Sequence, residues 1–501
     1  MPLNLITDRW IPVIRKDGAR ATIAPHEIAS GLFERPDWPR PDFNIACLEF
    51  LIGLVYLAAP PQDVEDWEER RVSDPERLRR ALLPFADAFN MTGPKPLFMQ
   101  DLDDLGADDP AGKDVKGVDV LFIDSAGENT VRHNKDLMVS RDRETSLDLA
   151  TAAMAFYTLQ VFAPVGGSGI RAGLRGGGPL TTLVDPGTGL WDLVWANVPY
   201  GVGGSLNNLP WTRPTRTSQP KSTTPTTIIA GGNAMSSEMF FSMPRRINLI
   251  IDKDRVVGVR QKQYGTNYER AVHPLTPYYL DKNNVLLPIH PREPRLGYEN
   301  WLGHLLPPTS TGQRASCLDV WDKRQAKVTA TVLMAGWNMS NATAIDYVEA
   351  RPVLHNLSAD AERHLRGMIE AATKVADATG KAAVAALSTR LTKAKVYKAA
   401  RTQFFDATDA EMDRLYADLA AGRPLPNIGR AWHDEMRRAA LQVFDAMTAT
   451  ALADPKVERQ KAIVGARVKL FDLFGTRVKA AKDLRAKLDM SNQEAHDAVD
   501  A

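Results

Sequence analysis

The segment 164–179 concentrates residues suited to close approach to a polyanion. Its sixteen positions hold seven glycines and two arginines, Arg171 and Arg175. Glycine has no Cβ, so its backbone can take positive φ and bring amide groups close to a ligand. The guanidinium groups can offer forked hydrogen-bond donors to phosphates or base edges. The segment is therefore a candidate nucleic-acid contact, although glycine clusters more often mark turns between packed elements.

The same segment fits a dinucleotide-binding fingerprint only in part. Gly167, Gly169 and Ala172 have the Gly-x-Gly-x-x-Ala spacing, which is meaningful only after a strand and before a helix. Here the hydrophobic periodicity predicts a helix over 146–162, before the glycines, and a short strand over 180–184, after them. This order is reversed, and the sequence holds no Gly-x-x-x-x-Gly-Lys-Ser/Thr motif. Neither kind of nucleotide-binding loop is expected.

Candidate catalytic and metal-binding residues are sparse. Cys47 and Cys317, the two cysteines, lie far apart in sequence, which favours reduced thiols and excludes a four-cysteine zinc site. The nine histidines lack His-x-x-x-His spacing. His433-Asp434 repeats the dipeptide of metal-dependent HD nucleases, but those sites need further His and Asp ligands on neighbouring helices. We therefore expect a protein that is not an enzyme and that binds no metal or cofactor.

Length and composition bound the fold class. A chain of 501 residues is expected to form two or more domains, and 44% hydrophobic with 25% charged residues is typical of a soluble globular protein. The formal net charge of +1 neither favours nor excludes nucleic acid, because a local basic patch is sufficient for binding. The sequence shows no signal peptide and no run of about 18 apolar residues. We expect a cytoplasmic protein with no membrane contact.

The elements that would position the glycine segment are predicted from periodicity and turn residues. A hairpin is expected at 10–24, around a Lys-Asp-Gly turn, followed by a largely buried helix over 44–59 that ends at two prolines. Polar helices over 61–71 and 75–90 come next. From there to about Arg351 the chain is rich in glycine, proline and short β-like runs, such as those at 246–251 and 256–259. We expect one large mixed α/β domain over 1–357.

The composition changes near Ser358, where helical periodicity becomes dominant. Thr408 with Glu411 is typical of a capping box that opens a helix, and Gly422-Arg423-Pro424 would end it. A C-terminal bundle of about four helices is therefore expected over 358–501, which makes the fold class α+β. Three apolar stripes define its core: Leu365, Met368, Ile369, Ala372 and Val375; Trp432, Met436, Ala440, Val443 and Met447; Val464, Val468, Phe471, Val478 and Leu488.

Six motifs, taken in order, resemble one known family. They are Leu-Asn-Leu-Ile-Thr-Asp-Arg-Trp-Ile-Pro-Val at 3–13, Leu-Phe-Met-Gln at 97–100, Gly-Leu-Arg-Gly-Gly at 173–177, Met-Pro before Ile-Asn-Leu at 243–249, His-Pro-Leu-Thr-Pro at 273–277 and Met-Ala-Gly-Trp at 334–337. The ordered set, which spans most of the chain, is similar to the large subunit of the type I-E CRISPR Cascade complex, known as CasA.

This resemblance implies a non-catalytic subunit of an RNA-guided antiviral surveillance complex. The subunit would recognise the protospacer-adjacent motif in double-stranded DNA from the minor groove and help open the duplex for R-loop formation. It would also support recruitment of the helicase-nuclease. The implied partners are guide RNA (crRNA), target duplex DNA, the helicase-nuclease, and the backbone, small and 5′-handle-binding Cascade subunits. A scaffold subunit of a ribonucleoprotein, without direct DNA reading, is the alternative.

The resemblance also assigns a glycine loop. By position, that loop falls on Gly166, Gly167, Ser168 and Gly169, with Arg171 beside it. Its implied role is backbone contact with minor-groove edges, because side chains there would obstruct close approach.

Two further elements implied by the resemblance contribute single side chains. The lysine finger of the family falls on Lys262, with Arg260 as an alternative register, and either cation could reach groove acceptors or phosphates. The wedge that splits the first base pair is a glutamine in the family and falls here on Asn341, which is one methylene shorter. Either Asn341 inserts less deeply, or Met339 assists, or the register differs.

A loop that grips the 5′ end of the guide RNA is implied at Phe122, Ile123 and Asp124. The acidic Asp124 would be unfavourable beside phosphate unless it accepts a hydrogen bond from a base or a sugar hydroxyl. The zinc-binding cysteine cluster of some family members is absent from this sequence.

Overall fold

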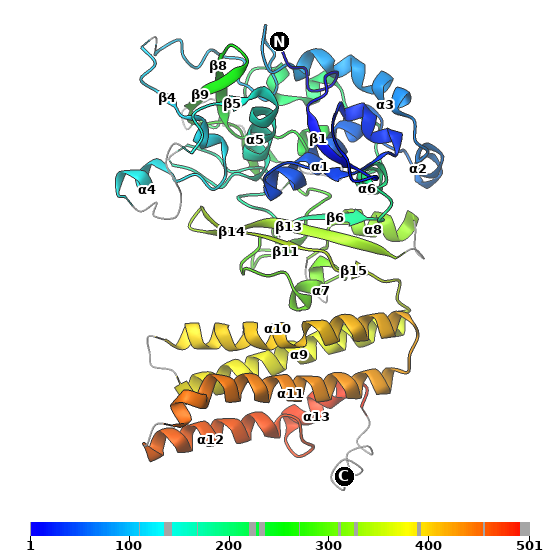
Figure 1. Cartoon of the computed structure of the whole chain (residues 1–501), viewed down its shortest axis with the longest axis vertical. Coiled ribbons are helices and arrows are strands. Elements are labelled where there is room, and N and C mark those ends of the chain that lie inside the picture. The colour runs from blue at the N-terminus through cyan, green and yellow to red at the C-terminus, as the bar shows by residue number, and fades with distance from the viewer. Residues whose placement is uncertain are drawn as a thin grey trace. The chain divides into compact units, whose positions relative to one another are not determined.

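The computed structural model describes residues 2–109, 111–134, 143–167, 169–219, 227–229, 236–269, 271–308, 312–324, 329–387, 392–453 and 456–490. The chain divides into two compact units (Figure 1). The first comprises Met1–Leu296 and Gly303–Leu354, and the second Gly297–Leu302 and His355–Ala501. Helices and several separate sheets coexist, so the predicted α+β class is confirmed.

The core of the first unit is built on the apolar helix α1 (Pro41–Ala58), which packs against α5 (Leu149–Phe162). Within the described residues, α1 is the one helix long and apolar enough to cross a membrane, but 83% of it is buried inside the protein, as in a core helix. Phe50 on α1 contacts several aromatic rings at centroid distances of 5.2–6.4 Å, including those of Tyr157 and Phe241. The remaining helices here are α2 (Val64–Arg70), α3 (Pro75–Leu82), α4 (Glu128–Arg132), α6 (Leu190–Asn197) and α8 (Ser316–Arg324), while α7 (Trp301–His304) spans the division between the units.

Several small sheets surround these helices. The predicted N-terminal hairpin is confirmed: β1 (Ile11–Arg15) pairs antiparallel with β2 (Arg20–Ile23) and with β3 (Phe33–Pro36). Two sheets carry the candidate site residues. In one, β9 (Arg255–Lys262) pairs with β8 (Arg246–Asp252), β4 (Val115–Lys116) and β5 (Leu147–Asp148). In the other, β13 (Ala330–Ser340) pairs with β14 (Thr343–Ala350), β15 (Val353–Leu354) and β6 (Thr181–Asp185).

Two short pairings complete the strands of the first unit. β7 (Thr227–Ile229) runs parallel to β10 (Asn267–Glu269), and β11 (Tyr278–Leu280) pairs antiparallel with β12 (Leu286–Pro288). The strands predicted at 180–184, 246–251 and 256–259 correspond to β6, β8 and β9.

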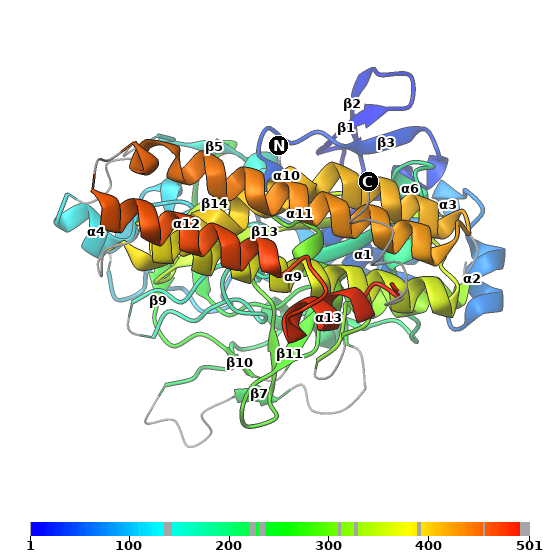
Figure 2. The same cartoon turned by 90° about the horizontal axis from the view of Figure 1, so that it is seen from below.

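The second unit is helical, with α9 (Ala359–Leu387), α10 (Lys393–Ala420), α11 (Leu425–Leu452), α12 (Val457–Asp472) and α13 (Lys479–Ala486). Figure 2 shows α9 to α12 lying side by side, with the short α13 against them. The first two predicted apolar stripes are buried, apart from the half-buried Met447.

The third predicted stripe is wrong for most of its members. Val464, Val468 and Phe471 are more than half exposed, and the buried residues of α12 are Ile463, Ala466 and Leu470. Both rows have helical spacing, so periodicity alone could not decide which row faces the bundle.

The predicted capping box is also wrong. Thr408 lies in the middle of α10, and its hydroxyl donates to the Phe404 carbonyl (2.9 Å), as threonines inside helices commonly do.

Candidate nucleic-acid interface

The glycine segment follows α5 in the chain, and its second half is hydrogen-bonded to the C-terminal end of that helix. The Gly173 N–H donates to the Ala163 carbonyl (2.9 Å), and the Gly178 N–H donates to the Phe162 carbonyl (2.8 Å). A Cβ on Gly173 would lie 2.5 Å from the Val161 carbonyl oxygen, which is too close for any other residue. These glycines are therefore packing and turn residues, which the sequence alone could not separate from the glycines of the tip.

The tip of the segment is a tight turn over 166–170. The Gly166 N–H donates to the Ile170 carbonyl (3.1 Å), and the Ile170 N–H donates to the Gly167 carbonyl (3.0 Å). Gly167 is exposed, and a Cβ built on it meets no atom within 4 Å. Ser168, the other predicted loop residue, lies outside the described residues. The tip thus presents an exposed backbone without a side chain at Gly167, which suits close approach to a ligand.

Gly169 joins this tip to the end of β9. It has φ of +75°, and its carbonyl accepts a hydrogen bond of 2.7 Å from the Tyr264 N–H. A Cβ on Gly169 would lie 3.0 Å from the Tyr264 ring and from Gln263. The glycine loop therefore contacts Gln263 and Tyr264, the two residues that directly follow the predicted lysine finger Lys262.

The two cations proposed for the lysine finger differ in their surroundings. Arg260 donates to the Asp109 carbonyl (3.3 Å) and fills the space beside Gly106, where a Cβ would overlap its guanidinium. Backbone N–H groups of Asp114 and Lys113 lower the pKa of Asp109, and the charges of Arg260 and Lys262 add to this. In the part of the chain that the structure describes, the Lys262 side chain makes no hydrogen bond or ion pair of its own. Of the two, Lys262 is the available cation.

The predicted wedge lies at the tip of the β13–β14 hairpin. Ser340 pairs with Thr343, so Asn341 and Ala342 form a two-residue turn, with φ of +48° and +63°. Positive φ at both positions defines a type I′ turn, where asparagine is favoured. Asn341 is exposed. The sequence reasoning did not predict this hairpin, because the turn carries Asn-Ala in place of the usual Asn-Gly.

The glycine segment also contacts this hairpin. A Cβ on Gly178 would lie 2.6 Å from the Trp337 carbonyl oxygen and 3.0 Å from Cε of Met339. Met339, which the sequence reasoning named as a possible helper of the wedge, thus packs against the glycine segment two positions before Asn341.

The two arginines of the segment point into the protein. Arg171 is half-buried and donates to the Ser218 hydroxyl (2.8 Å). Arg175 is 2% exposed and forms a bidentate ion pair with Glu49 on α1, at 2.6 and 2.8 Å. The expectation that Arg175 offers donors to nucleic acid is wrong, because a fully buried, paired guanidinium cannot reach it. The single glutamate inside the apolar helix at 44–59 was the sequence signal for such a partner.

Two of the three residues predicted to contact guide RNA, Phe122 and Asp124, interact with a pair of arginines. The side chains of Phe122 and Ile123 are buried, at 6% and 5% exposure. Arg40 and Arg143 lie over the Phe122 ring at 5.0 and 5.1 Å and pair with Asp124 at 3.0 and 3.2 Å. Although burial raises the pKa of Asp124, hydrogen bonds from these arginines hold it below its usual value. The two arginines neutralise the negative charge of Asp124, which would otherwise be unfavourable beside an RNA phosphate. The guide-RNA role of these residues stays a prediction.

The described ranges contain no group of three or more histidine, cysteine or acidic side chains placed to hold a metal ion. His433 is buried and lies 3.5 Å from the Asp434 carboxylate, which belongs to the next residue along the helix.

Comparison with solved structures shows the fold. The chain is 19% identical to CasA of Thermus thermophilus, with a TM-score of 0.74 over 94% of this chain and 99% of that one. It is 20% identical to Cse1 of Thermobifida fusca, with a TM-score of 0.72 over 98% of both. A chain of a CRISPR RNA-guided surveillance complex matches at 17% identity and a TM-score of 0.69, over 94% and 99% of the two chains.

The family model of CRISPR-associated protein Cse1 matches residues 4–443, and this confirms the resemblance seen in the six sequence motifs. The chain therefore belongs to the CRISPR-associated Cse1 family, the large subunits of type I-E Cascade.

Proposed function

We propose that this chain is the subunit of an RNA-guided antiviral surveillance complex that reads the protospacer-adjacent motif in double-stranded DNA and helps to open the duplex. Family membership and the likeness to a chain of a CRISPR RNA-guided surveillance complex support its place in such an assembly. In this proposal the chain supports recruitment of the helicase-nuclease, acts in the cytoplasm and performs no catalysis itself.

One observation carries the proposal. The glycine segment contacts both other elements assigned to DNA reading, through Gly169 against Tyr264 and through Gly178 against Met339. Three elements that the family resemblance assigned to distant parts of the sequence are thus connected by contacts within the first unit. A ligand at the tip over 166–170 would be close to the strand end that carries Lys262.

The chemistry of each element suits the minor groove. An exposed backbone at Gly167 can approach base edges, and the Lys262 ammonium can donate to the acceptors that A·T and G·C pairs share there. These acceptors form a degenerate code, so we expect the subunit to tolerate several related motifs. The Asn341 amide at an exposed hairpin tip could enter a base step, as wedge residues of minor-groove proteins do.

Binding by the assembled complex tests the proposal. The chain would be combined with guide RNA and the backbone, small and 5′-handle-binding subunits, and binding to duplexes with and without the motif would be measured over a salt series. The proposal predicts motif-dependent affinity that disappears when this chain is omitted and weakens when the chain carries Lys262→Ala. Motif-dependent binding that survives both changes would leave the chain as a scaffold without direct DNA reading.

A further inference from the structure

Arg245 is fixed in place by the last turn of α5. The Arg245 N–H donates to Oε1 of Gln160 (3.1 Å), and Nε2 of Gln160 donates back to the Arg245 carbonyl (3.0 Å). Gln160 itself is completely buried. The residue immediately before β8 is therefore tied to the helix end from which the glycine segment starts.

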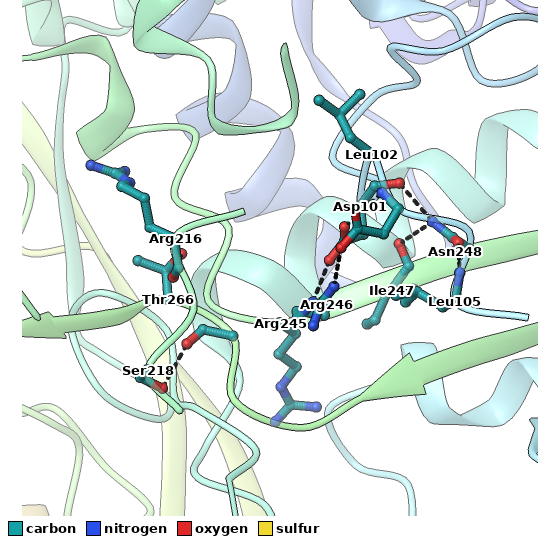
Figure 3. Close-up of polar contacts among 12 residues, drawn as sticks. Asp101, Leu102, Leu105, Arg216, Ser218, Arg245, Arg246, Ile247, Asn248 and Thr266 are labelled. Carbon is teal, nitrogen blue, oxygen red and sulfur yellow. Dashed lines mark hydrogen bonds and ion pairs between the residues drawn. The ribbon is translucent and has the colours of Figure 1, made fainter. Parts of the chain in front are cut away.

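The Arg245 guanidinium holds the glycine loop at both ends. Its Nη2 donates to the Pro164 carbonyl (2.6 Å), and its Nε donates to the Arg171 carbonyl (3.3 Å). Pro164 and Arg171 flank the tip over 166–170, so one side chain bridges the two limbs of the loop. In Figure 3 the Arg245 side chain extends away from Asp101, whereas the neighbouring Arg246 reaches it.

Among the described residues, no carboxylate forms an ion pair with the Arg245 guanidinium. Arg246 pairs with Asp101 and Asp103, whereas the acceptors of the Arg245 guanidinium within the described part of the chain are the two loop carbonyls. Burial lowers the pKa of Arg245 to about 10, so the group is still charged at neutral pH. Its hydrogen bonds to the loop are therefore charge-assisted, which makes them stronger than bonds between neutral groups.

We propose that Arg245 is a positioning residue that fixes the glycine loop in the conformation that approaches DNA, without touching the DNA itself. The reason for arginine is geometric: a planar guanidinium can donate along two directions at once, whereas a lysine ammonium is a point charge on a flexible stem. This inference rests on the proposed function and adds a residue that the sequence motifs did not indicate.

Hydrogen exchange of the loop amides tests the positioning role without DNA. The variants are Arg245→Gln and Arg245→Lys, with Arg246→Lys as the matched control. We expect exchange over 164–171 to become at least about tenfold faster in both Arg245 variants, because a half-buried pair of charge-assisted hydrogen bonds is lost, and to be unchanged in the control. Wild-type protection in Arg245→Lys and Arg245→Gln would overturn the proposal. If Arg245→Gln fails to fold, Arg245→Lys decides the question.

DNA binding by the assembled complex separates positioning from direct contact. We expect the affinity ratio between motif-bearing and motif-free duplexes to fall about tenfold in Arg245→Lys, with the salt dependence of binding unchanged. In Arg245→Gln, a loss of about 0.9 in the slope of log K against log salt would mean a direct phosphate contact and would overturn the proposal. Absence of motif discrimination in the wild-type complex would instead contradict the proposed function, while the exchange result would still stand.

Discussion

The Gly169 carbonyl accepts a 2.7 Å hydrogen bond from the Tyr264 N–H, and this bond connects the glycine loop to the strand that ends at Lys262. Because Gly169 has φ of +75° and a Cβ there would lie 3.0 Å from the Tyr264 ring, any side chain would disturb both elements together. Substitution of Gly169 therefore cannot distinguish a lost DNA contact from a damaged fold. Gly167 can, since its Cβ position is open.

We expect Gly167→Gln to abolish motif-dependent duplex binding while leaving folding and assembly intact. The new side chain would project from the tip and prevent the close backbone approach that minor-groove contact needs. Electrophoretic mobility shifts with motif-bearing duplex measure the loss. Gly465→Gln, at another glycine with open space around its Cβ, is the control and should bind like wild type. Full binding by a folded Gly167→Gln complex would show that the tip does not approach DNA.

We expect Lys262→Ala to weaken binding to motif-bearing duplex by about 1–3 kcal/mol, the range for a contact with base edges. Arg260→Ala should instead loosen the segment around Asp109, since Arg260 is packed there and Lys262 is not. Affinity and thermal unfolding, measured for both variants, check this division. An equal loss on motif-free DNA would make Lys262 a phosphate contact, and a larger binding loss in Arg260→Ala would reverse the assignment.

Acidification should destabilise the first unit through His273. Its ring is buried, and burial, with a smaller effect of Arg175, holds its pKa well below the usual value. Below about pH 6.5 the unfolded chain binds a proton at this residue that the folded protein does not, so stability falls by up to about 1.4 kcal/mol per pH unit. Thermal unfolding of wild type and His273→Asn between about pH 7.5 and 5.5 tests this. A weaker pH dependence is expected in His273→Asn; identical curves would contradict it.

Elements could be predicted from the sequence where their apolar residues either line a single face or run continuously, because such patterns match one buried arrangement only. The helix at 44–59 is apolar all round and became α1 of the core, and the N-terminal hairpin had a clear turn. On α12 two apolar rows share the same period, and only packing decides that Leu470 is buried and Phe471 exposed.

The candidate site was predictable only in part, because local sequence does not show which side chains the fold brings together. Family motifs indicated the glycine loop and Lys262 by position, but nothing in the local sequence of Arg175 or Arg245 separates a buried arginine from a DNA contact. Their partners, Glu49 and the carbonyl of Pro164, are distant in sequence. Glu49 stands out as a lone glutamate in an apolar helix, but only the folded chain shows which arginine it pairs with.

At Asn341 the chain departs from the glutamine of its family. Two properties of this residue can be separated: its backbone holds a positive φ of +48° in the hairpin turn, and its amide projects from the exposed tip. Glycine satisfies the first property and removes the second, whereas glutamine extends the amide but is less favoured in the left-handed region, at a cost of about 1 kcal/mol. Asn341→Gly is therefore the sharper test of a wedge.

If Asn341 is the wedge, Asn341→Gly should slow R-loop formation on intact duplex and have little effect on a target whose first base pairs are mismatched, because unstacking there is already complete. Asn341→Gln should retain opening, since the longer amide reaches further into the step. R-loop formation on both substrates, followed with a base-analogue fluorophore beside the motif, measures these effects. Equal impairment of Asn341→Gly on both substrates, or none on either, would make Asn341 a turn residue only, and Met339, which packs against Gly178, would be the next candidate to substitute.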